Sequence, residues 1–273
     1  MAGELGRYRE RLETSPLRRD VLSTYTSPVP PGGAPFVLHV LPDCFVDILW
    51  GPQGHLRVAG PDRRYRTVAL PPGEIVALRF RRGASGPLLG VAASDLADRR
   101  VPLADLWGPQ AERLAEQLDG APSTQVVRGI LRAALLPRLA DAPPRDELVH
   151  AALALLQRAP TTRIAQLCEA FDVSERQLRR RFQTAVGYGP KRLQRIFRLQ
   201  RFLRLGRQSE GRRGIAQLAN LAGFVDQAHL TNECVELFGF TPTAVLARGC
   251  AATAPAAQPT MSVSYKTGIA NGQ

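Results

Sequence analysis

Two stretches of the sequence repeat one pattern: residues 164–190 read IAQLCEAFDVSERQLRRRFQTAVGYGP, and residues 215–242 read IAQLANLAGFVDQAHLTNECVELFGFTP. Both begin with Ile-Ala-Gln-Leu, and a leucine, a glycine and a proline recur further along once one extra residue near the turn of the second stretch is allowed for. Self-similarity of this kind is produced by a duplicated supersecondary unit. The sequence therefore predicts two copies of one helical unit.

The first copy has the pattern of two short helices joined by a tight turn. Ser174, followed three residues later by Gln177, forms a capping box that is typical of a helix start. Leu178, Phe182 and Val186 recur every four residues and predict one buried face of the second helix. The helical periodicity then places three arginines and a glutamine on or beside the outward face: Arg176, Arg179, Arg180 and Gln183.

The second copy repeats this arrangement with other residues. Gly223 falls in the turn, where a residue without a Cβ suits the backbone, and Asp226 is the expected N-cap of the next helix. Leu230 and the apolar residues one and two turns later predict the buried face. The residues predicted to face outward or to flank that face are Gln227, Ala228, His229 and Asn232.

Positive charge is concentrated between the two copies and in the first one. The chain has a net charge of +12 and a pI of about 10.6, which favours a polyanionic partner. Residues 174–207 contain eleven Lys and Arg residues against Glu175 alone, whereas residues 215–248 carry a net charge of −2. This charge indicates a nucleic-acid surface centred on the first copy, with an ordinary solvated helical surface as the alternative.

A helix over about 191–205, started by Pro190, is predicted to join the two copies. Lys191 and Arg195 lie on its polar side, where we expect them to contact DNA phosphates, which would position the protein without specifying a sequence.

The motifs IAQLCEAF, VSERQLRRRF, IAQLANLAGF and FGFTP resemble the AraC/XylS family of bacterial transcription regulators, over roughly residues 146–248. The resemblance implies a DNA-binding unit of two helix-turn-helix motifs joined by a linker helix. Asp172 stands where the family usually has glycine, and aspartate can adopt a positive φ. Ala228 and Asn232 are among several departures in the second unit, so we expect its DNA contacts to be weaker.

Base contacts follow from the chemistry of these outward side chains. Arginine pairs bidentately with guanine, so Arg176, Arg179 and Arg180 are expected to reach base edges in a major groove. Asn232 suits adenine and Ala228 a thymine methyl group. Two units entering successive major grooves on one face of DNA would lie about 34 Å apart.

The N-terminal half reads as β-structure. Short apolar runs such as FVLHVL (residues 36–41) and EIVALRF (residues 74–80) are separated by Pro and Gly turns, which predicts a small barrel or sandwich. Helical periodicity starts near residue 103 and is interrupted at Pro143 and Pro144. The fold class is therefore α+β. The expected divisions are a β-rich domain at 1–102, a helical linker or dimerisation region at 103–145, the double helix-turn-helix domain at 146–249 and a disordered tail at 250–273.

The β-rich half resembles, more loosely, the sensor-like domain found ahead of this unit in actinobacterial members of the family, through segments such as VLPDCFVDILWG and LLGVAASDLADRRVPLADLWG. Strand alternation would place Asp43, Phe45 and Asp47 on one face and Cys44 on the other, as a core thiol rather than a redox sensor. Asp43 and Asp47 are expected either to form ion pairs with the surrounding arginines or to take part in binding an anionic effector. His39 and His55 are expected to be structural.

Several functions are disfavoured by what the sequence contains. No apolar run is long enough to cross a bilayer and the first residues do not resemble a secretion signal, so we expect a cytoplasmic protein without a membrane partner. The four cysteines are scattered, and no catalytic or phosphate-loop motif occurs. We therefore expect no enzyme activity, no metal site and no cofactor.

The expected function is that of a sequence-specific transcription regulator, an activator or a repressor, whose partners are double-stranded DNA and RNA polymerase. The N-terminal domain would receive an unknown signal, either a small-molecule effector or, in the alternative, a protein partner alone. The sequence leaves open whether the protein forms a homodimer.

Overall fold

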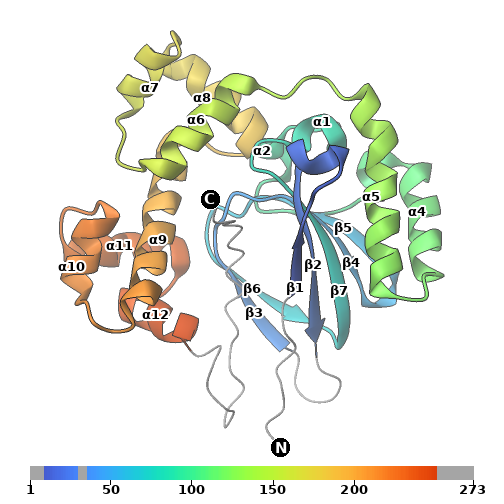
Figure 1. The fold of residues 1–273 in the computed structure, drawn as a ribbon, viewed down its shortest axis with the longest axis horizontal. Helices are drawn as coiled ribbons and strands as arrows, with labels where there is room; N and C mark the ends of the chain where they lie inside the picture. The colour runs from blue at the N-terminus through green and yellow to red at the C-terminus, as the bar shows by residue number, and fades with distance from the viewer. Residues whose placement is uncertain (1–8, 30–35, 251–273) are drawn as a thin grey trace, which may run out of the picture.

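The computed structural model describes residues 9–29 and 36–250, which form an antiparallel sheet followed by a helical region (Figure 1). The predicted α+β class is confirmed. The predicted tail lies outside the described residues, except that the last helix runs to Cys250.

Eight strands are described, six of them in one sheet of order β1-β2-β7-β4-β5-β8 and two in a separate ribbon, β3-β6. Their bounds are β1 Arg9–Leu12, β2 Val21–Val29, β3 Phe36–Val40, β4 Asp47–Gly51, β5 His55–Ala59, β6 Arg66–Leu70, β7 Gly73–Phe80 and β8 Arg100–Pro102. Every strand pair is antiparallel. Among the described strands β1 and β8 are open edges, so the sheet is not the closed barrel that the sequence offered as one outcome.

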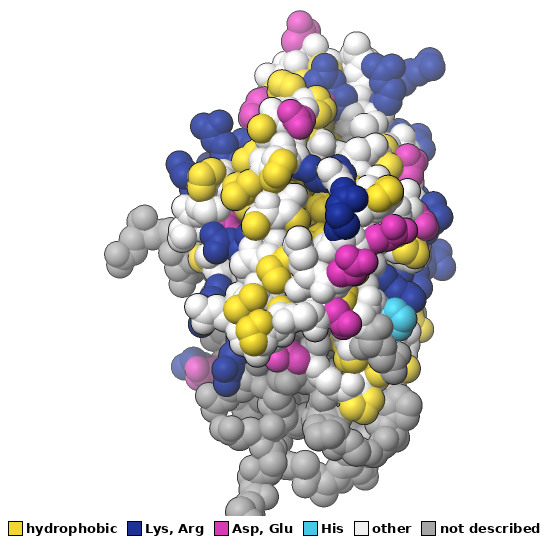
Figure 2. Space-filling view, turned by 90° about the vertical axis from the view of Figure 1, so that its right-hand side faces the viewer, with side chains coloured by type: hydrophobic (Ala, Val, Ile, Leu, Met, Phe, Trp, Pro, Cys, Tyr) yellow, Lys and Arg dark blue, Asp and Glu magenta, His cyan; other side chains and the backbone are white. Residues whose placement is uncertain are grey.

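Helices cover the sheet and complete its core. The N-terminal half contains α1 Ser85–Leu89, α2 Ala93–Leu96, α3 Ala104–Trp107, α4 Pro109–Asp119 and α5 Thr124–Asp141. Leu114 of α4 and Leu131 of α5 join Ile48 and Leu78 of the sheet in one buried cluster. The region expected to link two domains thus packs on the sheet. Its outer surface mixes apolar side chains with charges of both signs (Figure 2).

Helices are the regular secondary structure of the C-terminal half over its described residues, and short turns connect them. It contains α6 Glu147–Arg158, α7 Ile164–Ala170, α8 Glu175–Val186, α9 Pro190–Ser209, α10 Ile215–Ala222, α11 Gln227–Phe238 and α12 Pro242–Cys250. The predicted buried faces are confirmed: Leu178, Phe182, Leu230 and Cys234 are fully enclosed. No helix among the described residues is long and apolar enough to span a membrane.

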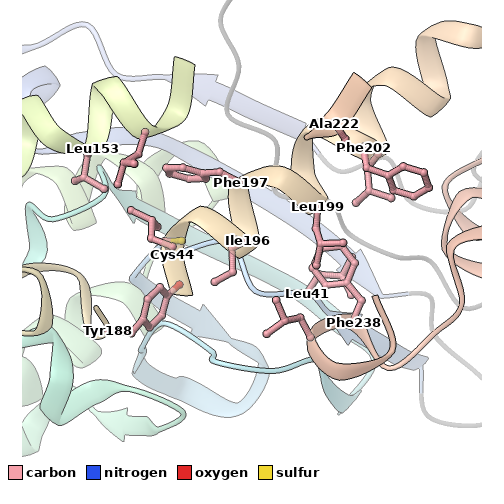
Figure 3. Close-up of a cluster of buried hydrophobic side chains, with 14 of the residues drawn as sticks. Leu41, Cys44, Leu153, Tyr188, Ile196, Phe197, Leu199, Phe202, Ala222 and Phe238 are labelled. Carbon is pink, nitrogen blue, oxygen red and sulfur yellow. The ribbon is translucent and has the colours of Figure 1, made fainter. Parts of the chain in front are cut away.

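The segment between β3 and β4 differs from the predicted alternation. Residues 41–46 are not a strand, and Cys44 has a φ of +67°. Residues 44–48 are all buried, so Cys44 and Asp47 do not divide between a buried and an exposed face. Alternation requires an extended backbone, whereas this segment turns away from the sheet. Leu41 and Cys44 thereby join the core of the helical half, where Cys44 lies near Tyr188 and Phe197 and Leu41 lies near Phe238 (Figure 3).

Candidate DNA interface

The start of α8 is fixed by its capping box. The hydroxyl of Ser174 accepts a hydrogen bond from the Gln177 backbone at 3.2 Å, and the Gln177 side chain accepts one from the Ser174 backbone at 2.9 Å. Asp172 in the preceding turn has a φ of +48°, as its substitution for glycine predicts. The turn and cap together set the direction in which α8 leaves α7.

The exposed face of α8 carries the four predicted side chains. Arg176, Arg179, Arg180 and Gln183 are all exposed, on the side opposite the buried leucine and phenylalanine. Among the described residues their side chains form no hydrogen bond or ion pair. Arg181 differs, because its guanidinium pairs with Asp146 at 3.1 Å and ties α8 to the N-cap of α6. Three guanidinium groups are therefore presented to solvent by one rigid helix.

The second unit presents a smaller and less charged face. Gly223 has a φ of +94°, and Asp226 caps α11 by accepting a hydrogen bond from the His229 backbone at 2.7 Å. Gln227, Ala228 and Asn232 are exposed. His229 is half-buried, with its ring edge-on to Phe224 at 5.4 Å, so part of its role here is structural.

The linker helix α9 holds the two residues predicted to contact phosphates, and it places them differently. Lys191 is exposed, 3.8 Å from Glu175. Arg195 pairs with Glu233 at 2.6 Å and also with Glu236, both on α11. Desolvation lowers the pKa of Arg195, but the hydrogen bonds to Glu236 and Glu233 outweigh it and raise the pKa. Arg195 is therefore ion-paired with α11, and this pairing argues against the phosphate contact that the sequence predicted.

One loop of the sheet domain reaches both units, which no sequence motif had indicated. The backbone N–H of Tyr65 donates to the carbonyl of Leu237 at 2.8 Å, and the Tyr65 ring covers Gly239, where a Cβ would come within 2.1 Å of it. At the end of α8, Gly187 lies against Pro61 in the same way. The loop thus contacts the C-terminal caps of both outward-facing helices.

A buried ionic cluster lies beneath the sheet domain's contact with α9. Asp47 accepts two hydrogen bonds from Arg79 at 2.8 Å and a third from the Tyr25 hydroxyl at 2.9 Å. Of the two alternatives for Asp47, the structure favours the ion pair. Arg82 lies between the rings of Phe45 and Phe197, 3.9 and 5.2 Å from their centroids, and so connects this cluster to the linker helix.

Cys44 sits at the same contact as a buried thiol. Burial is the main cause that raises its pKa to about 12, so the reactive thiolate is strongly disfavoured. His39 is buried and 3.3 Å from the Thr67 hydroxyl, whereas His55 is exposed. The described residues contain no cluster of three or more metal-ligating side chains.

Comparisons with known proteins match both halves of the chain. Residues 167–248 match a family model described as a helix-turn-helix domain, and residues 14–102 match one described as a domain of unknown function (DUF6597). No curated protein matches the chain.

Similar solved structures include several of ToxT from Vibrio cholerae. One is 11% identical, with a TM-score of 0.42, and the match covers 82% of this chain and 97% of that chain. An apo lysine-to-alanine variant is 12% identical, with a TM-score of 0.42 and coverage of 86% and 98%. A third ToxT structure, with a bound unsaturated fatty acid, is 12% identical, with a TM-score of 0.39 and coverage of 86% and 96%.

Proposed function

We propose that this chain binds specific DNA sequences through two helix-turn-helix units. It is a DNA-binding transcription regulator in which an AraC-type helix-turn-helix domain follows a DUF6597 domain. The observation that carries the proposal is the exposed face of α8, where three arginines stand free of partners among the described residues on a helix fixed by its cap. Such a helix can enter a major groove and present guanidinium forks to base edges.

The two units have unequal roles in this proposal. Arg176, Arg179, Arg180 and Gln183 of α8 supply the main base contacts. Gln227, Ala228, His229 and Asn232 of α11 supply a smaller share, because they carry no fixed charge and Glu233 and Glu236 lie on the same helix. Lys191 is kept as a phosphate contact, whereas Arg195 is left out because of its two ion pairs.

The N-terminal domain sets activity in response to a signal. This part of the proposal is supported by the loop of the N-terminal domain that contacts the caps of both outward-facing helices. A conformational change in the N-terminal domain could therefore alter the positions of both units. The signal is a small molecule, or alternatively a protein partner alone. RNA polymerase as a partner, a homodimer and the division of the chain at residues 102, 145 and 249 belong to the same proposal.

Selection of bound sequences from a random duplex pool tests the proposal with the full-length protein at fixed salt. We expect one enriched motif with two elements 10 to 10.5 base pairs apart, about one helical turn. A variant with Arg176, Arg179 and Arg180 all changed to Gln should enrich nothing. Loss of enrichment in the variant alone supports α8 as the reading helix, and no enrichment by either protein overturns the proposal.

A further inference from the structure

A second candidate site lies where the sheet domain meets the linker helix. A cavity of about 500 Å³ opens between the loop at residues 62–66 and the first turn of α9. Its lining contains four arginines and one aromatic ring: Asp62, Arg63, Arg64, Tyr65, Arg66, Asp98 and Arg192. Apart from Tyr65, every residue of this lining is charged and four of them are arginines, so the cavity is suited to an anion.

The two aspartates of the cavity already have cationic partners. Asp62 is buried and pairs with Arg66 at 3.2 Å and with Arg100 at 3.1 Å. Asp98 lies 3.4 Å from the Arg63 guanidinium and also accepts a hydrogen bond from the Arg63 backbone at 2.7 Å. These pairs fix the walls of the cavity. The carboxylate of Glu236 acts electrostatically on the remaining two arginines, but its ion pair is with Arg195.

Arg64 and Arg192 are those remaining arginines. Arg64 is exposed and forms no hydrogen bond or close ion pair with a described residue. Arg192 donates one hydrogen bond to the carbonyl of Arg63 at 3.1 Å, while its buried Nε has no partner among the described residues. Desolvation and then the charge of Arg195 lower the pKa of Arg192, and Arg64 adds to the effect, whereas Glu236 and Tyr188 oppose it in part. An anion between the two guanidinium groups would offset these costs.

We propose that this cavity binds a small phosphate-bearing ligand, with Arg64 and Arg192 as its principal contacts. Guanidinium forks match the geometry of phosphate oxygens, and a phosphate monoester brings two negative charges to two guanidinium groups that form no ion pair with a described residue. The loop that lines this cavity also contacts the C-terminal caps of α8 and α11, through Pro61 and Tyr65. Ligand binding is thereby coupled to the part of the molecule that holds both helix-turn-helix units.

Titration calorimetry of the full-length protein with inorganic phosphate, in the absence of DNA and at constant ionic strength, tests the proposal. We expect saturable binding that Arg64→Gln and Arg192→Gln each weaken about tenfold or more, because each removes a charge-assisted contact. Arg113→Gln, an equal charge change on the exposed surface of α4, should weaken it less than twofold.

Each outcome bears on the proposal. Equal weakening by all three variants would show general charge attraction, and no saturable binding would show that the site does not take phosphate; either result overturns the proposal. Acetate binding as tightly as phosphate overturns the phosphate preference. If Arg192→Gln does not fold, the exposed Arg64→Gln decides alone. Since no DNA is present, failure here leaves the proposed DNA reading untouched.

Discussion

At the scale of single residues, Arg180 and Asn232 occupy equivalent positions on α8 and α11, 52 residues apart, as do the buried Leu178 and Leu230. A bidentate arginine contact to guanine contributes about 1 to 3 kcal/mol of discrimination. We therefore expect Arg180→Ala to weaken binding to the selected duplex about tenfold or more, and Asn232→Ala to weaken it less. Fluorescence titration at fixed salt measures both, and equal losses would show that the two helices contribute equally.

The buried thiols of Cys44 and Cys234 make a pH prediction at the same scale. Burial raises the pKa of each to about 12 from an ordinary value of 9.0. The unfolded chain loses these protons at lower pH than the folded chain does, so their contribution to stability is complete below pH 9 and falls as the pH rises towards 12. Urea unfolding from pH 7 to 11 should show this decline.

A matched variant separates the thiols from other groups that titrate at high pH. Cys234→Ala removes one of the two raised thiols, so the decline of the unfolding free energy above pH 9 should be shallower than in the unchanged protein. The same slope in both proteins would show that the Cys234 thiol ionises as readily in the folded chain as in the unfolded one.

At the scale of elements, the Ser174 capping box is the local device that starts α8. Ser174→Ala removes the bond that the Ser174 hydroxyl accepts from the Gln177 backbone, while the backbone N–H of residue 174 can still donate to the Gln177 side chain, and should cost about 1 kcal/mol of stability. Ser123→Ala is the matched control, because Ser123 caps α5 through one hydrogen bond of 3.3 Å to the Val126 backbone. Both variants should lower the free energy of unfolding by urea. Only Ser174→Ala should also weaken DNA binding. Equal weakening by both variants would show that the Ser174 cap has no specific role in DNA recognition.

The elements of the helix-turn-helix units were predictable because their determinants are local. The cap at Ser174, the turn at Asp172 and the four-residue spacing of Leu178 and Phe182 all act within a few residues. The segment at 41–46 was predicted wrongly, because its path is set by packing against α9 rather than by its own alternation. Its apolar pattern resembles that of a buried strand, and nothing nearby reveals the distant partner.

Arg195 shows the same limit within the candidate site. Its exposure on the polar side of α9 followed from helical periodicity, but its partners Glu233 and Glu236 are about forty residues away. The contact of Tyr65 with Leu237 and Gly239 likewise joins segments that share no motif. Gly239 was visible as a repeated glycine, and what it accommodates became visible only in the fold.

At the scale of the whole molecule, the loop carrying Tyr65 should stabilise the contact between the two halves. Gly239→Ala forces a Cβ to within 2.1 Å of the Tyr65 ring at a φ of +73°, whereas Gly211→Ala at a φ of +79° meets nothing within 4 Å. Each variant should lower the free energy of unfolding by about 1 to 2 kcal/mol, because alanine is strained in the left-handed region. Gly239→Ala should lower it by a further ~1 to 3 kcal/mol, because its Cβ also meets the Tyr65 ring. Urea unfolding compares them, and equal costs would show that the loop yields freely.

Two units joined by α9 are proposed to bind successive major grooves, and a change of spacing between the two elements of the selected duplex tests this arrangement. Inserting five base pairs between the two elements turns one element to the opposite face of the DNA. We expect the affinity of the protein for this duplex, measured at fixed salt, to fall to that for a duplex carrying the α8 element alone. Unchanged affinity on the lengthened duplex would contradict it, because a single unit would then account for all of the sequence-specific binding.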